Sequence, residues 1–163
     1  MPPMMVETLN NNQTAPPKKG VGAILFACNI NAVRSAMAEA MIKITFPGEI
    51  FVDSCGVLPG SPDGFAIAVM NEIGINMAAH QPKSFVELDS EFYDVIISFS
   101  LEAHQAAIGL TKSLDCETLY WPVDNLADLA GSRDERLRAY RHVRDDIQSK
   151  LESYFNKAIA GKT

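Results

Sequence analysis

The sequence has few cysteines and no long apolar segment. Its three cysteines, Cys28, Cys55 and Cys116, are irregularly spaced, and no C-x-x-C motif or His/Cys cluster accompanies them. We therefore expect neither a disulfide scaffold nor a zinc site, and we predict no metal and no cofactor. Residues 1–19 lack the apolar core of a signal peptide and any run of transmembrane length, so a location in the reducing cytoplasm, away from membranes, is expected.

An excess of positive charge is also missing. The chain has 20 acidic and 14 basic side chains and a formal net charge of −6. Proteins that bind nucleic acids or anionic membranes usually present basic surfaces, so neither is expected as a partner. Any anion would have to be held locally, by an arginine and backbone amides, rather than by the overall field of the protein.

The length and hydrophobic pattern indicate one domain. The chain has 163 residues, of which 47% are hydrophobic. We expect an N-terminal disordered tail over residues 1–20, rich in Pro and Asn, a single α/β domain over 21–158 and a short C-terminal tail over 159–163. Short apolar runs predict strands over 21–27, 50–53, 93–99 and 118–121, and helical patterns follow over 35–45, 65–73, 101–110 and 133–155.

This alternation of strands and helices predicts the fold class. It favours right-handed crossovers and a four-stranded parallel sheet with helices on both faces, which is a three-layer α/β sandwich. In such sheets ligands bind beyond the carboxyl ends of the strands. Cys28, at the end of the first strand, would lie there.

The stretch around Cys28 can bind an anion. Residues 24–39 read ILFACNINAVRSAMAE, so an apolar strand ends near Cys28, five residues follow, and Arg34 and Ser35 open a helix. The loop can wrap so that the helix N-terminus directs its unpaired N–H groups at the loop's centre. Arg34 adds a planar fork that matches two phosphate oxygens, and both features stabilise a thiolate. The spacing therefore predicts a nucleophile beside a site for a dianion.

This stretch resembles a known family. An apolar strand, Cys-x5-Arg-Ser and then x-Met-Ala-Glu are similar to the low-molecular-weight protein tyrosine phosphatases and to the arsenate reductases that share their fold, and the chain looks like a divergent bacterial-type member. The resemblance implies a cysteinyl-phosphate intermediate with Cys28 and Arg34 as catalytic residues. It also implies that phosphate is bound by the loop and the helix start: Asn29, Ile30, Asn31, Ala32, Val33, Arg34 and Ser35.

The expected proton donor is altered. The family uses an Asp, usually followed by Pro, in the loop after the fourth strand, and in this chain those positions fall on Asn125 and Leu126. An amide cannot act as an acid, so Asp124, one residue earlier, is the candidate. Asp128 is a more distant alternative.

The loop also departs from the family pattern. Ile30 stands where Gly is common and would be strained if that position required a positive φ. Val33 replaces a second Cys of the tyrosine phosphatases, so no neighbouring thiol protects Cys28. Asn31 would either hold the loop by hydrogen bonds or tolerate a local positive φ, and Ser35 would donate to the thiolate, cap the helix, or both.

Other reactive side chains have weaker patterns. Cys55 and Cys116 could be resolving thiols of an arsenate reductase, although the thioredoxin-coupled enzymes place a Cys where this chain has Ser100. The three histidines have no spacing that pairs them or places one beside Cys28, so they are interpreted as incidental.

The sequence thus predicts a metal-free cysteine phosphatase. Its substrate would be phosphotyrosine in a phosphorylated protein or another aryl or small phosphomonoester, and inorganic phosphate or a similar oxyanion would occupy the loop. Two alternatives stay open: a regulatory protein that binds phosphate with little or no turnover, and an arsenate reductase.

Overall fold

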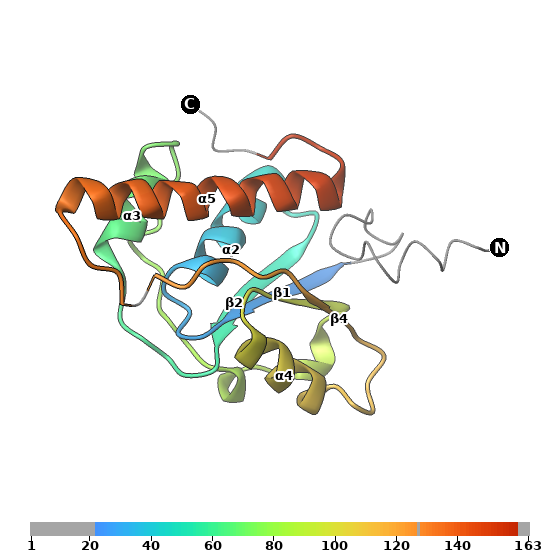
Figure 1. Cartoon of the computed structure of the whole chain (residues 1–163). Coiled ribbons are helices and arrows are strands. Elements are labelled where there is room, and N and C mark those ends of the chain that lie inside the picture. The colour runs from blue at the N-terminus through green and yellow to red at the C-terminus, as the bar shows by residue number, and fades with distance from the viewer. Residues whose placement is uncertain (1–21, 127, 160–163) are drawn as a thin grey trace.

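Four parallel strands form one sheet in the computed structural model, which describes residues 22–126 and 128–159 (Figure 1). The strands are β1 (Ala23–Cys28), β2 (Phe51–Gly56), β3 (Val95–Ser98) and β4 (Glu117–Tyr120), and their order in the sheet is β2-β1-β3-β4. β1 is central because it pairs with β2 on one side and β3 on the other. The predicted α/β class with a four-stranded parallel sheet is confirmed.

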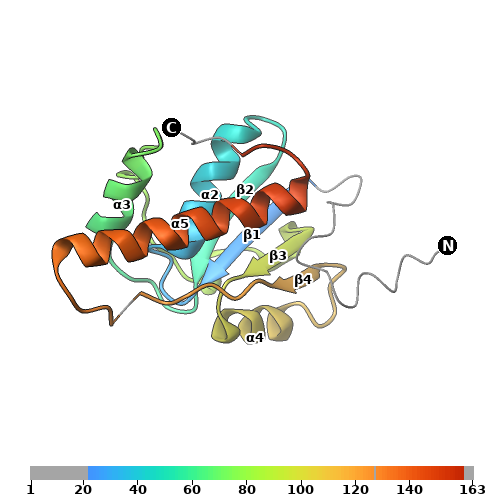
Figure 2. The same cartoon turned by 45° about the horizontal axis from the view of Figure 1, so that its top comes forward.

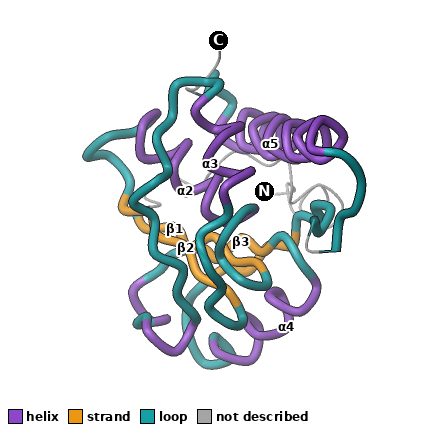
Figure 3. The backbone as a smooth tube through the Cα atoms, turned by 90° about the vertical axis from the view of Figure 1, so that its left-hand side faces the viewer, coloured by secondary structure: helices purple, strands orange, loops and turns teal. Residues whose placement is uncertain are grey.

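Helices cover both faces of the sheet (Figures 1 and 3). On one face lie α2 (Arg34–Thr45), α3 (Gly64–Asn71) and α5 (Arg133–Phe155), and on the other lie α4 (Leu101–Leu110) and the short 3-10 helices η2 (Phe85–Glu87) and η3 (Ser90–Phe92). Every residue of β1 is buried. Its side chains alternate between the two cores, as expected for a strand that is covered on both sides.

The element boundaries follow the sequence closely in the helices and less so in the strands. Helix α5 occupies the predicted span and begins with a capping box in which Ser132 and Glu135 exchange hydrogen bonds. β2 continues three residues beyond the predicted end at Asp53, because Ser54, Cys55 and Gly56 pair with the end of β1.

Both predicted tails lie largely outside the described residues. The N-terminal tail over 1–20 falls there entirely, as does 160–163 at the other end. Ile159, which the sequence assigns to the C-terminal tail, is buried, and its backbone oxygen accepts a hydrogen bond from Gln148 on α5. None of the helices in the described part of the chain combines the length and hydropathy needed to cross a membrane.

Candidate active site

The loop after β1 is held mainly by backbone hydrogen bonds to the segment after β2. The N–H groups of Val57, Leu58 and Gly60 donate to the carbonyl oxygens of residues 28, 29 and 30. Gly56 lies directly beneath this loop, and a Cβ atom at Gly56 would come within 2.8 Å of three loop backbone atoms. The loop can take this path only because Gly56 has no side chain.

Asn31 holds the loop from inside. Its φ is 59°, a left-handed conformation that Asn tolerates better than most residues. Its amide nitrogen donates to the hydroxyl oxygens of Ser35, at 2.8 Å, and Ser54, at 2.9 Å, and its side-chain oxygen accepts from the Lys83 N–H at 3.0 Å. Both interpretations of Asn31 are therefore correct. Ile30 has no positive φ, so the strain considered for that position is absent.

Cys28 lies at the base of the loop, against the first turn of α2. Only 1% of its surface is exposed, and its Sγ lies 3.0 Å from the Ser35 hydroxyl. Ser35 does not cap α2, because the N-cap position is Val33 and no side chain caps the helix. The Ser35 hydroxyl also donates to the Cys55 carbonyl oxygen, so it is held beside the sulfur.

Arg34 is anchored at one end of its guanidinium group. Nη1 donates to the backbone oxygens of Phe99, at 3.3 Å, and Val123, at 3.1 Å. These two carbonyls follow β3 and β4, and the segment from β4 to α5 passes the carboxyl end of β1 (Figure 2). The anchoring leaves the other N–H groups of the planar fork for an oxyanion.

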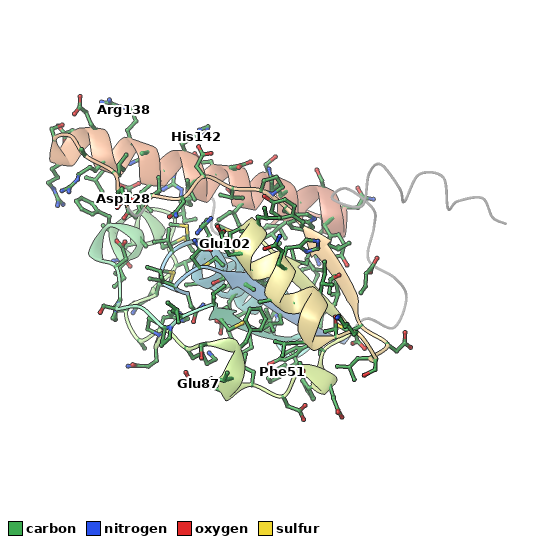
Figure 4. The ribbon with its side chains drawn as sticks, turned by 60° about the horizontal axis from the view of Figure 1, so that its bottom comes forward. Phe51, Glu87, Glu102, Asp128, Arg138 and His142 are labelled. Carbon is green, nitrogen blue, oxygen red and sulfur yellow. The ribbon has the colours of Figure 1, made fainter. Side chains whose placement is uncertain are left out.

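A cavity of about 170 Å³ opens above Cys28. Its lining combines residues of the loop after β1 with residues from distant parts of the chain: Cys28, Ile30, Val33, Arg34, Asp63, Asn125, Leu126 and Tyr140. The candidate acid Asp124 lines a different cavity, beside Arg138 and His142 of α5, whereas Asn125, an amide, lines the cavity of Cys28. Figure 4 shows Arg138 and His142 on α5 and Asp128 in the segment before it.

Asp63 and Tyr140 were not singled out from the sequence. Asp63 is the N-cap of α3: its Oδ1 accepts from the N–H groups of Phe65 and Ala66, and its Oδ2 accepts from the Tyr140 hydroxyl at 2.7 Å. Burial, and then the hydrogen bond to Asp63, raise the pKa of Tyr140 well above its usual value, so its hydroxyl remains a donor. The SPDG segment signals a helix start but not the direction in which Asp63 points.

A comparison with known families decides the relationship. Residues 23–162 match the family model described as low molecular weight phosphotyrosine protein phosphatase. The chain belongs to this family. As a member of the low-molecular-weight phosphatase family, it shares its fold with the tyrosine phosphatase AmsI of Erwinia amylovora, with a TM-score of 0.71, 20% identity and coverage of 86% of this chain and 97% of that one.

Several relatives of this low-molecular-weight phosphatase family member are named for another activity. Over 134 residues the chain is 28% identical to the glutaredoxin arsenate reductase of Synechocystis sp., covering 82% of this chain and 96% of that protein. It is 27% identical to an arsenate reductase of Halalkalibacterium halodurans, covering 80% and 93%. An arsenate reductase solved in its phosphate-binding state superposes with a TM-score of 0.64 at 26% identity, covering 80% and 94%. The proteins similar to this chain are thus named for both activities.

The other two thiols of this family member are poorly placed to react with Cys28. Cys55 of β2 pairs with Ala27 of β1 and faces the core under α4. Cys28, one residue after Ala27, faces the core under α2 and α5. Burial, reinforced by Cys28, raises the pKa of the Cys55 thiol far above its usual value. Cys116 precedes β4, an edge strand, and so lies at the amino end of the parallel strands, whereas Cys28 lies at the carboxyl end of central β1; burial raises the pKa of Cys116 to about 11.

His80 corrects the interpretation that all three histidines are incidental. Its Nε2 lies 2.8 Å from the backbone oxygen of Asn31, and its Nδ1 lies 3.9 Å from a carboxylate oxygen of Glu39. Glu39 in turn accepts a hydrogen bond from Ser54, the same hydroxyl that Asn31 contacts. His80 contacts the loop directly at Asn31, and Glu39 contacts it indirectly through Ser54, so both residues help to hold the loop in place. The described residues contain no group of three His, Cys, Asp or Glu side chains that could hold a metal.

Proposed function

We propose that this protein hydrolyses aryl or small phosphomonoesters through a cysteinyl-phosphate on Cys28. The observation that carries the proposal is that the Cys28 side chain, the Arg34 fork and the N-terminus of α2 meet at one small cavity. This is the arrangement that a phosphoryl group needs, because the nucleophile lies below it and donors surround its three outer oxygens.

The first chemical step uses the residues of the loop. The Cys28 thiolate attacks phosphorus in line with the departing oxygen, and the Ser35 hydroxyl stabilises the thiolate by turning its proton from the Cys55 carbonyl oxygen to the sulfur. The equatorial oxygens are bound by the backbone amides of residues 29–35 and by Arg34, whose anchoring to two carbonyls keeps the fork in place. Water then hydrolyses the phosphoenzyme, which releases phosphate and restores the thiolate.

The cavity walls favour an apolar leaving group. Ile30, Val33, Leu126 and the ring of Tyr140 line the space above the sulfur. An aryl group gains from contact with such walls, whereas a highly charged group does not. Phosphotyrosine in a protein and a free aryl phosphate both fit this description.

Arsenate reduction is the second candidate, because the curated relatives carry that name. Reduction of arsenate to arsenite takes two electrons, which two thiols can supply by forming a disulfide. Cys55 faces the opposite core and Cys116 lies at the opposite end of the strands from Cys28, so the second thiol would have to come from an external donor such as glutathione. The name of the Synechocystis relative supports a donor of this kind.

Steady-state hydrolysis of p-nitrophenyl phosphate at mildly acidic pH, with a chelator present, tests the main proposal. Turnover by the native chain and its loss in Cys28→Ser are expected, with Cys116→Ser as the matched control that retains full activity. Binding of vanadate without any turnover would instead support a phosphate-binding protein. Arsenate-dependent consumption of NADPH in a glutathione–glutaredoxin system, in the absence of phosphatase activity, would favour the reductase.

A further inference from the structure

One carboxylate lines the cavity above Cys28, and it comes from the N-terminus of α3. Among the described residues that line this cavity, Asp63 alone carries an acidic side chain. The loop after β4 contributes Asn125 and Leu126 to the same lining, and neither can accept a proton as a base. Asp124 lines a separate cavity of about 460 Å³ on α5.

Asp63 is held firmly in this place. Two backbone N–H groups at the start of α3 donate to Oδ1, and the Tyr140 hydroxyl donates to Oδ2. Tyr140 is itself 6% exposed, and its ring packs against Phe65 in a tilted arrangement, with 5.3 Å between the ring centroids and 34° between the ring planes. Each carboxylate oxygen can accept more than one hydrogen bond, so Oδ2 retains capacity for a proton from the cavity.

We propose that Asp63 is the general base that activates water for hydrolysis of the Cys28 phosphoenzyme. The proposal rests on the proposed function, because it concerns the second step of that reaction. It assigns the role to the segment between β2 and α3 instead of the loop after β4. Both oxygens of Asp63 are acceptors in the structure, which is the form that a base requires.

The step balances without any further reagent. The water oxygen forms a bond to phosphorus as the bond between phosphorus and Cys28 Sγ breaks, and the electron pair of that bond returns to sulfur as the thiolate. One water proton passes to the Asp63 carboxylate, and hydrogen phosphate leaves. The cavity of 170 Å³ is several times the about 30 Å³ that one water occupies, so a phosphoryl group and a water can be accommodated together.

Pre-steady-state kinetics of Asp63→Asn test the assignment. Asn is as good an N-cap as Asp, so α3 is expected to keep its start. With p-nitrophenyl phosphate we expect a burst approaching one nitrophenol per enzyme, then a steady rate at least about 100-fold below that of the native chain, since general bases contribute 10²–10⁴. Acid quenching should trap the phosphoenzyme.

The matched control is Asp89→Asn, which makes the same change at the N-cap of η3 and does not alter a residue that lines the cavity. It should retain the native burst and rate. If Asp63→Asn is poorly folded by circular dichroism, Asp63→Ser keeps a capping oxygen and should show the same accumulation of phosphoenzyme.

The outcomes separate the two proposals. A native steady rate in Asp63→Asn, with no trapped phosphoenzyme, overturns the role of Asp63 and leaves the phosphatase intact. Accumulation in Asp124→Asn but not in Asp63→Asn also overturns it, and assigns the base to Asp124. If the native chain forms no phosphoenzyme at all, the proposed function fails and the role of Asp63 fails with it.

Discussion

Replacing Asn31 by Ala should destabilise the protein far more than replacing the other asparagine of the same backbone conformation. Asn31 has a φ of 59° and Asn156 a φ of 53°, and both lie in the left-handed region. Asn156 is an exposed residue that ends α5, and Asn31 is fully buried within the loop after β1. The pair therefore separates the effect of backbone conformation from the effect of buried hydrogen bonds.

The magnitude follows from the contacts of Asn31. Holding Ala in the left-handed region costs about 1 kcal/mol at either site. Asn31→Ala also removes two bonds that its amide donates and one that its oxygen accepts, each contributing about 1 kcal/mol. We expect a loss of about 4 kcal/mol in the free energy of unfolding for Asn31→Ala, and about 1 kcal/mol for Asn156→Ala.

Urea unfolding followed by circular dichroism measures both values, because the midpoint shifts in proportion to the lost free energy when the slope is unchanged. Vanadate affinity of Asn31→Ala, measured in the folded range, should fall as well, since the loop loses its internal support. Equal losses for the two variants would refute the reasoning. Such a result would mean that the buried bonds of Asn31 contribute nothing net to stability.

Three further results are expected. Arg34→Lys should lower kcat/KM for p-nitrophenyl phosphate by about 100-fold, because a lysine cannot bridge two carbonyls and also present a fork to phosphate; an unchanged kcat/KM would contradict this. Gly56→Ala should abolish phosphate binding in calorimetry because its Cβ would collide with the loop, whereas Gly64→Ala, with no atom within 4 Å, should bind as the native chain does. Since raised pKa values keep both thiols protonated, iodoacetamide at pH 8 should leave Cys55 and Cys116 unmodified by mass spectrometry until the pH approaches about 11 for Cys116; rapid labelling of either at pH 8 would show that its thiol is not suppressed.

The helices were easier to predict than the strands because their signals are local. The apolar residues of α5 recur every three or four positions over 23 residues, and a capping box marks its start, so its limits can be predicted without knowledge of its partners. The end of β2 contains Ser54 and Gly56, which do not favour a strand. Its length is decided by pairing with β1, and pairing between distant segments is not encoded in either segment alone.

The residues of the candidate site also divide into those that a local pattern predicts and those that depend on the tertiary fold. Cys28, Arg34 and Ser35 belong to one continuous stretch, so their spacing alone predicts an anion site. His80 reaches the loop from 49 residues away, and Tyr140 meets Asp63 across 77 residues. No local pattern indicates these contacts, because they depend on how α3, α5 and the segment before η2 are arranged over the sheet. The assignment of Asp124 was likewise limited, since the direction of a loop side chain depends on that arrangement; its role stays a prediction.

The backbone hydrogen bonds between the loop after β1 and the segment after β2 affect how distant relatives of this family can be recognised. The shape of the loop is maintained by Gly56, by main-chain hydrogen bonds and by Asn31. The side chains of Ile30, Ala32 and Val33 are therefore not needed to maintain it. Ile30 and Val33, which line the cavity, can change and alter what enters it while the path of the loop persists. A search for distant members should therefore weigh the glycine at the end of the second strand together with the cysteine, the arginine and the loop asparagine, and give less weight to the other loop residues.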